Sequence, residues 1–158
     1  MAGTREFEVR NLEFKLTLNV SAETLFKAWT DPMKFQNWFA LEDSHSIPII
    51  EFDLRAGAKY RIGIKHPDGT LRIIGGIIKR IIPNELLSFT WSVGGGGTQQ
   101  MKSTVTAEFV QKSEGSELIV RHQFIPGEKL RLQFEQEWKT RLARLENMLS
   151  KLNTSVVN

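Results

Sequence analysis

A chain of 158 residues without cysteine has the length of one common domain and cannot form a disulfide, a thiol nucleophile or a cysteine-based zinc site. Its formal charge is +3 and its isoelectric point about 9.3, but basic and acidic residues alternate, so no nucleic-acid footprint stands out. The sequence shows neither a signal-peptide core nor a run of roughly 20 apolar residues, so we expect one soluble, cytoplasmic domain over residues 1–158, without a membrane span or a nucleic-acid partner.

The first predicted element is a half-buried strand over residues 7–20, where apolar and polar side chains alternate. Ser21 follows as an N-cap, so a helix begins there. This helix should end near Thr30, because Pro32 disfavours the helical conformation of the residue before it. Asp31 in turn caps a second short helix that has Pro32 at its first position. The two helices carry five aromatic residues, Phe26, Trp29, Phe35, Trp38 and Phe39.

From Ile47 onward the apolar period changes to two, and turn signals divide the chain into short strands. These are expected at residues 49–54, 59–65, 71–82, 87–93, 103–110 and 117–124. Pro67 to Gly69 predicts a tight hairpin turn, and the glycine pair at 75–76 predicts a bend or a close backbone approach. The glycine-rich loop at 94–97 lacks the Lys and Ser/Thr of a phosphate-binding loop, so we interpret it as a hinge candidate.

One long amphipathic helix is predicted over residues 130–152. Its apolar residues recur at helical spacing, at Leu130, Phe134, Trp138, Leu142, Leu145, Leu149 and Leu152. Its outer face is expected to carry Glu135 with Lys139 and Glu137 with Arg141, each with the acid four residues before the base. At a 1.5 Å rise per residue the helix spans roughly 34 Å, enough to lie across a whole sheet.

The order of the predicted elements is strand, two short helices, six strands and one long helix. In a single domain this order favours an α+β fold in which a curved antiparallel sheet of about seven strands packs around the long carboxyl-terminal helix. A concave sheet around a helix can leave an apolar cavity between them, with its mouth near the aromatic helix pair. A filled core is the alternative.

Several short motifs resemble a known superfamily in their order and spacing. They are Ser21–Pro32, Trp38–Phe39, Phe52–Gly57, Pro67–Gly69 and Gly76. Together they resemble the START-like (SRPBCC) superfamily, and within it the bacterial proteins grouped with the carboxyl-terminal domain of the activator of the 90-kDa heat-shock protein ATPase. The resemblance implies a helix-grip (Bet v 1-like) fold. It also implies that relatives bind hydrophobic small molecules or lipids, that a few are cyclases or dehydratases, and that the eukaryotic namesake is a co-chaperone. Many relatives have a glycine where this chain has Glu137.

The histidines form no clear catalytic or metal-binding pattern. His45, His66 and His122 do not lie at helical spacing from one another or from a partnering acid, so no metal site is expected. His122 shares the strand parity of Leu118 and Phe124 and should point inward. There it is either a hydrogen-bonded core histidine or a group that binds a ligand or acts as acid or base. We expect His66 to be solvated and His45 to lie near the pocket mouth.

The candidate ligand-binding residues are inward-facing aromatic and aliphatic side chains together with one histidine. They are Trp38, Phe39, Tyr60, Ile62, Phe89, Trp91, His122, Phe134 and Trp138. We assign no catalytic residue, metal or cofactor. The leading hypothesis is non-catalytic binding of a hydrophobic small molecule or lipid between the sheet and the long helix, in a monomer or homodimer.

Two other functions are compatible with the sequence. The first is an enzyme of the cyclase or dehydratase type, in which His122 acts with Tyr60 or a loop acid. The second is a co-chaperone-like interaction, with a chaperone as partner. It would use an outer sheet face bearing Arg61, Lys65, Arg72 and Lys79.

Overall fold

The computed structural model describes residues 9–94 and 102–157, with side chains described for 10–94 and 102–151. The described residues form ten elements: β1 (Val9–Leu18), α1 (Ala22–Thr30), α2 (Pro32–Phe39), β2 (Ser46–Glu51), β3 (Lys59–Lys65), β4 (Leu71–Ile82), β5 (Leu86–Gly94), β6 (Ser103–Gln111), β7 (Ser116–Pro126) and α3 (Glu128–Val157). The predicted order of elements is confirmed. Residues 7–8 of the first predicted strand and 95–97 of the predicted loop lie outside the described residues.

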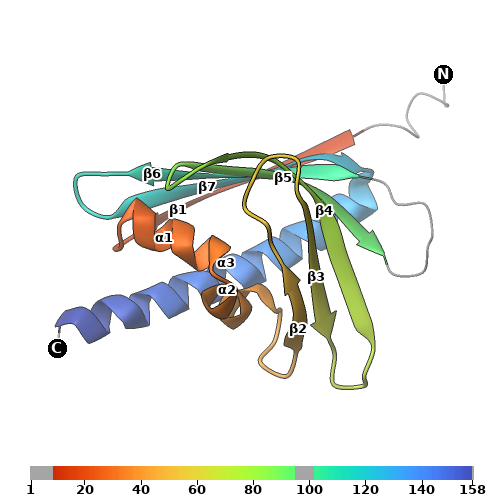
Figure 1. Ribbon diagram of the computed structural model, residues 1–158, viewed down its shortest axis with the longest axis horizontal. Helices are drawn as coiled ribbons and strands as arrows, with labels where there is room; N and C mark the ends of the chain where they lie inside the picture. Colours follow the sequence, from red (N-terminus) through yellow and green to blue (C-terminus); the bar gives the residue numbers. More distant parts are fainter. Residues whose placement is uncertain (1–8, 95–101, 158) are drawn as a thin grey trace.

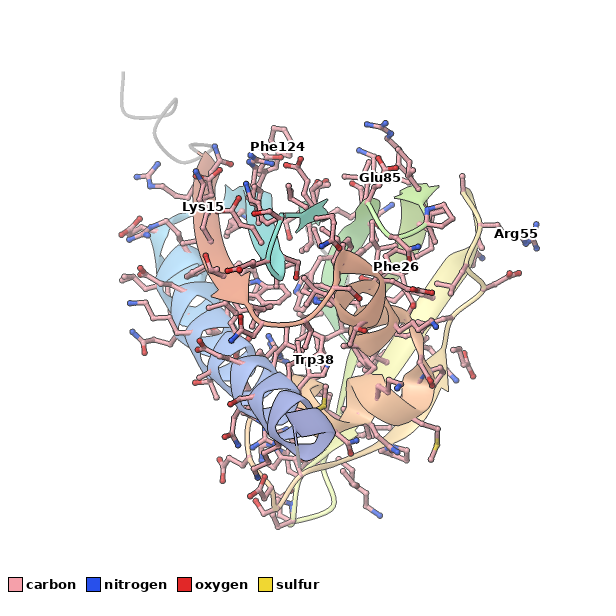
Figure 2. All side chains as sticks on the ribbon, turned by 90° about the vertical axis from the view of Figure 1, so that its left-hand side faces the viewer. Lys15, Phe26, Trp38, Arg55, Glu85 and Phe124 are labelled. Carbon is pink, nitrogen blue, oxygen red and sulfur yellow. The ribbon has the colours of Figure 1, made fainter. Side chains whose placement is uncertain are left out.

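The seven strands form one antiparallel sheet in the order β1-β7-β6-β5-β4-β3-β2. Figure 1 shows this sheet arching over α3, with α1 and α2 on the same concave side. The core lies between the sheet and the helices; Figure 2 shows Trp38 inside it, whereas Arg55 points away. This architecture confirms the helix-grip fold. None of the helices in the described part of the chain is long and apolar enough to cross a membrane.

Local contacts explain the two short helices. The Ser21 side chain accepts a hydrogen bond of 3.1 Å from the backbone N–H three residues on, and caps α1. The Asp31 side chain accepts one of 3.0 Å from the N–H two residues on, and caps α2. Both predicted caps are confirmed. The Trp38 indole then donates to the carbonyl oxygen of Ala28 at 2.8 Å, which fixes α2 against α1.

The glycine pair of β4 marks a close approach between strands. A Cβ atom on Gly76 would lie 2.4 Å from the carbonyl oxygen of Thr90 in β5, which is closer than van der Waals contact allows. That same carbonyl accepts a hydrogen bond from the Tyr60 hydroxyl of β3. The register of β4 against β5 shifts between Ile78 and Arg80, just beyond this contact. The backbone N–H of the residue after Gly76 donates to the Thr90 hydroxyl at 2.9 Å. The lack of a side chain at Gly76 therefore allows three strands to meet at one carbonyl group.

We expect Gly76→Ala to lower the free energy of unfolding by about 2 kcal/mol or more, because the new methyl group must push β4 away from the Thr90 backbone. Gly75→Ala is the matched control, since its Cβ would lie 3.1 Å from the nearest atom, the Tyr60 carbonyl oxygen, and needs a smaller adjustment. Urea denaturation of both variants measures the difference. Equal losses of stability in the two variants would contradict the explanation.

The boundaries of β2 differ from the prediction. The strand covers Ser46–Glu51, whereas alternation predicted residues 49–54. After Glu51 the chain forms a local turn, in which the Arg55 amide donates to the Asp53 carbonyl at 2.8 Å and the Arg55 side chain pairs with the Asp53 carboxylate at 2.8 Å. Leu54 is consequently 41% exposed. Polar and apolar residues also alternate through this turn, so the sequence pattern alone predicted that the strand continues to residue 54.

The predicted inward orientation of Phe124 is wrong. This side chain is 56% exposed and points away from the core (Figure 2). Between the pairs Arg10 with Ile125 and Leu12 with His122, β7 contains one residue more than β1, and Phe124 adopts a positive φ of 63°. Beyond the extra residue, the side chains that would have pointed into the core point outward, and their neighbours point inward. Ile125 therefore enters the core in place of Phe124.

Candidate functional site

An apolar pocket lies between the helix pair and strands β3 to β5, and we call it the aromatic pocket. It is lined by Trp29, Phe35, Phe39, Phe52, Leu54, Tyr60, Ile62, Ile78, Leu87, Phe89 and Trp91. Its free volume is about 30 Å³, enough for about one water molecule. The pocket lies near the aromatic helix pair, where the sequence predicted a mouth, but it is far smaller than a ligand-sized cavity. Side chains fill most of the space between sheet and helices.

The nine predicted ligand-binding residues divide into two groups. Five of them line the aromatic pocket: Phe39, Tyr60, Ile62, Phe89 and Trp91. The other four, Trp38, His122, Phe134 and Trp138, are buried outside its lining. His122 stacks on Phe134 with ring centroids 4.8 Å apart, and Trp138 contacts Trp91 at 5.6 Å. The two groups are thus in contact through Trp91, but only the first faces open space.

His122 is completely buried, and both of its ring nitrogens are hydrogen-bonded. The Trp138 indole donates to Nδ1 at 3.0 Å, so Nδ1 carries no proton. Nε2 therefore carries the proton and donates to Ser103 Oγ at 2.7 Å, while that hydroxyl donates to the Trp91 carbonyl at 3.4 Å. Burial, with a smaller contribution from the charge of Arg141, lowers the pKa of His122 to about 3. This geometry matches a hydrogen-bonded core histidine.

Tyr60 is also engaged with the protein. Its hydroxyl donates to the Thr90 carbonyl, and its ring packs edge-on against Phe89 with centroids 5.3 Å apart. Burial raises the pKa of the Tyr60 phenol above its ordinary value, so the group stays protonated. Both groups of the enzyme hypothesis, Tyr60 and His122, therefore have protein partners for their polar atoms.

Arg141 is a buried residue that the sequence interpretation missed. It was expected on the outer face of α3, but it is completely buried. Its Nε donates to the Phe39 carbonyl at 2.9 Å, and its guanidinium carbon lies 4.3 Å from the centre of the Phe39 ring and 5.6 Å from those of Trp91 and Trp138. Its Nη2 has no hydrogen-bond partner. The available signal was its spacing, because Arg141 follows Trp138 by three residues and precedes Leu145 by four.

Arg141 belongs to a charge cluster with Glu137 and Arg72, which are half-buried. Arg72 binds Glu137 with two hydrogen bonds of 3.0 Å, and Arg141 Nη1 lies 3.7 Å from the same carboxylate. The prediction that Arg72 lies on the outer sheet face is wrong, because it shares the inward parity of Ile74 and Ile78. Two positive charges and one negative charge leave a net charge of +1. The pKa of Arg141 is lowered to about 9, mainly by burial; Glu137 opposes this change and Arg72 adds to it. Arg141 therefore remains charged at pH 7.

A larger hollow lies on the surface among α1, α2 and α3, and we call it the helix groove. It encloses about 650 Å³ and is open to solvent. Its lining consists of Thr24, Ala28, Lys34, Asn37, Asp43, Arg144, Asn147, Met148, Leu149 and Lys151. This mixed lining fits an apolar ligand less well than the aromatic pocket does, although the volume is greater.

The two remaining histidines meet at the far end of the β3/β4 hairpin. His66 Nδ1 lies 3.2 Å from His45 Nε2, and the Glu42 carboxylate lies 3.8 Å from the same nitrogen. His66 is half-buried in this pair, although we expected it to be solvated. Among the described residues, no group of three or more His, Cys, Asp or Glu side chains is arranged to hold a metal ion.

Comparison with known proteins places the chain in a family. Residues 19–150 match the family described as activator of Hsp90 ATPase homolog 1-like protein. The chain belongs to this family. It resembles the AHSA1 protein from Silicibacter pomeroyi at 19% identity and a TM-score of 0.78, over 89% of this chain and 98% of that one. No curated protein sequence matches it.

Two further solved structures share the fold. A putative uncharacterized protein from Rhizobium leguminosarum is 23% identical, with a TM-score of 0.79 over 91% of this chain and 96% of that one. The AHSA1-like protein from Aeromonas hydrophila is 16% identical, with a TM-score of 0.74 over 91% of this chain and 94% of that one. At these identities the likeness shows the fold alone. Membership of the activator of Hsp90 ATPase homolog 1-like family supports either a ligand-binding or a co-chaperone-like role, without naming the ligand.

Proposed function

We propose that this chain binds a small apolar molecule in the aromatic pocket and carries out no reaction on it. The supporting observation is the chemistry of the pocket wall, whose lining side chains are all apolar or aromatic. The polar side-chain groups of this lining are the Tyr60 hydroxyl, which already donates to the Thr90 carbonyl, and the indole N–H groups of Trp29 and Trp91, which are buried without a hydrogen-bond acceptor. Such a wall selects a ligand by shape and apolar surface, and it presents no free acid, base or nucleophile.

Binding requires the aromatic pocket to widen, since its free volume of about 30 Å³ has room for only about one water molecule. Phe52 and Leu54 lie on the segment between β2 and β3 and line the side of the pocket where Leu54 is exposed. The segment is anchored to β4 further along, where residues 57–58 exchange two backbone hydrogen bonds of 2.8 Å with Ile78. An outward movement of Phe52 and Leu54 leaves these anchors intact. We therefore expect the ligand to enter past Leu54.

Leu54→Trp is expected to weaken the binding of N-phenyl-1-naphthylamine, a neutral apolar fluorophore, by about tenfold or more, because the larger ring covers the entrance. Leu71→Trp is the matched control. It makes the same change at a similarly exposed leucine, 46% against 41%, that does not line the pocket. Fluorescence titration of the wild type and of both variants measures the dissociation constants, and native mass spectrometry of the wild type measures the stoichiometry.

Saturable binding of one molecule to the wild type and to Leu71→Trp, with loss in Leu54→Trp, would support the proposal. A wild type that shows no saturable binding would refute it. Equal weakening by the two tryptophan variants would place the binding site elsewhere.

A co-chaperone-like interaction is the second candidate, and the family match favours it. The surface proposed for it is weaker than the sequence indicated, because Arg72 points inward and Arg61 pairs with Glu51 at 3.2 Å. The test is the ATPase rate of a 90-kDa heat-shock protein with and without this chain. An unchanged rate, together with no co-purification, would count against this candidate.

A further inference from the structure

The buried guanidinium of Arg141 is incompletely satisfied by the protein. Its Nε has a good partner in the Phe39 carbonyl at 2.9 Å, whereas its nearest acid, Glu137, lies 3.7 Å from Nη1 and already accepts two hydrogen bonds from Arg72. Nη2 has no partner, although no part of the residue is exposed to water. A buried ionised donor without an acceptor is costly, and an apolar residue of similar length at this position would avoid that cost. An anion that reaches Nη2 would remove it.

This guanidinium lies directly behind the aromatic pocket. Phe39 and Trp91 line the pocket, and the same two rings lie 4.3 and 5.6 Å from the guanidinium carbon of Arg141. Arg141 does not itself line the pocket, so the rings separate it from the open space. Phe39 is the last residue of α2, and a ligand in the pocket would reach the guanidinium only by displacing the ring of Phe39 or of Trp91. The pocket thus has an apolar wall and a cationic group behind it.

We propose that the ligand of the aromatic pocket is an apolar monocarboxylic acid whose carboxylate binds the guanidinium of Arg141. This inference rests on the proposed function and names the class of its ligand. A single negative charge matches the net charge of +1 on the Arg72, Glu137 and Arg141 cluster. A guanidinium presents N–H groups in a planar arrangement that suits a carboxylate, and it attracts one strongly where water is excluded. His122 is neutral and has both nitrogens occupied, so it does not compete for the anion.

The test compares two probes of nearly the same shape, 2-naphthoate, which is an anion at pH 7.5, and 2-naphthamide, which is neutral. Titrations that follow tryptophan fluorescence give both dissociation constants for the wild type, Arg141→Met and Lys139→Met. Lys139→Met is the matched control, because it removes one positive charge from the same helix at a side chain that is 58% exposed. Circular dichroism and urea denaturation check that each variant is folded.

We expect the wild type and Lys139→Met to bind naphthoate about tenfold more tightly than naphthamide, or more. Arg141→Met should bind the two probes equally while keeping its affinity for naphthamide. Equal affinities in the wild type would overturn the carboxylate inference and leave apolar binding intact. A preference for naphthoate that survives in Arg141→Met would overturn it too. Failure of the wild type to bind either probe or N-phenyl-1-naphthylamine would refute the proposed function, and the inference with it.

If Arg141→Met does not fold, Arg141→Lys replaces it. Lysine keeps the charge but loses the planar set of N–H groups, so naphthoate should still be preferred, by a smaller factor. A lysine variant with no preference for naphthoate over naphthamide would then contradict the inference.

Discussion

Glu137→Gln should lower the free energy of unfolding by about 3 to 5 kcal/mol. The substitution keeps the shape of the side chain but removes the one negative charge between Arg72 and Arg141, whose side chains are only 18% and 1% exposed. Two guanidinium groups would then share the interior without a counter-charge. Urea denaturation at pH 7 measures the loss.

Glu135→Gln is the control on the same helix. Its carboxylate pairs with Lys139 at 3.7 Å and with Arg131 at 3.6 Å, near the surface, so the loss should stay within about 1 kcal/mol. The double variant Glu137→Gln/Arg141→Met should recover part of the stability, because one of the two unpaired charges is removed. Losses of the same size in Glu137→Gln and Glu135→Gln would contradict the role of Glu137 as the counter-charge of the cluster.

The second large effect concerns acid stability. We expect the wild type to lose about 3 kcal/mol of unfolding free energy between pH 6.5 and pH 4 through His122 alone. The native pKa is depressed to about 3 from an ordinary 6.5, so in this window the unfolded chain binds a proton that the native protein excludes. The stability is therefore fully present above pH 6.5 and declines as the pH falls towards 3.

His122→Gln isolates this contribution. A glutamine amide still offers an acceptor and a donor for Trp138 and Ser103, but it does not titrate. The variant should be less stable than the wild type at pH 7, and its stability should fall about 3 kcal/mol less between pH 6.5 and pH 4. Urea denaturation at several pH values measures this, with His66→Gln as the control. The same pH dependence in the wild type and in His122→Gln would show that the histidine titrates normally in the native protein.

The fold was predictable because its elements rest on local chemistry. Caps such as Ser21 and Asp31, two apolar periods and the glycines of tight turns specify the elements without knowledge of their partners. The predictions were wrong where a contact between residues distant in sequence determines the orientation of a side chain. An extra residue opposite β1 turns Phe124 outward, and nothing in the sequence of β7 marks it.

The site was less predictable than the fold, for two physical reasons. The free volume of a pocket depends on the rotamers of the side chains that line it, and neighbours distant in sequence determine these rotamers. The alternation around Tyr60 and Ile62 predicts that both side chains point inward, but it does not predict how much space remains between them and the helices. A buried charge also contradicts the usual partition of polar residues. Arg141 occupies a position on the apolar face of α3, yet its residue type and the preceding Glu137 favoured a solvated ion pair.

Gly76 lies where the wall of the aromatic pocket passes from β4 to β5. Tyr60 and Ile78 contribute to this wall from β3 and β4, and Phe89 and Trp91 contribute from β5. Because the absence of a side chain at Gly76 sets how closely β4 approaches the backbone of β5, it also sets the separation of these two halves of the wall. A side chain at position 76 should therefore change the affinity of the pocket for its ligand as well as the stability, although residue 76 itself does not line the pocket.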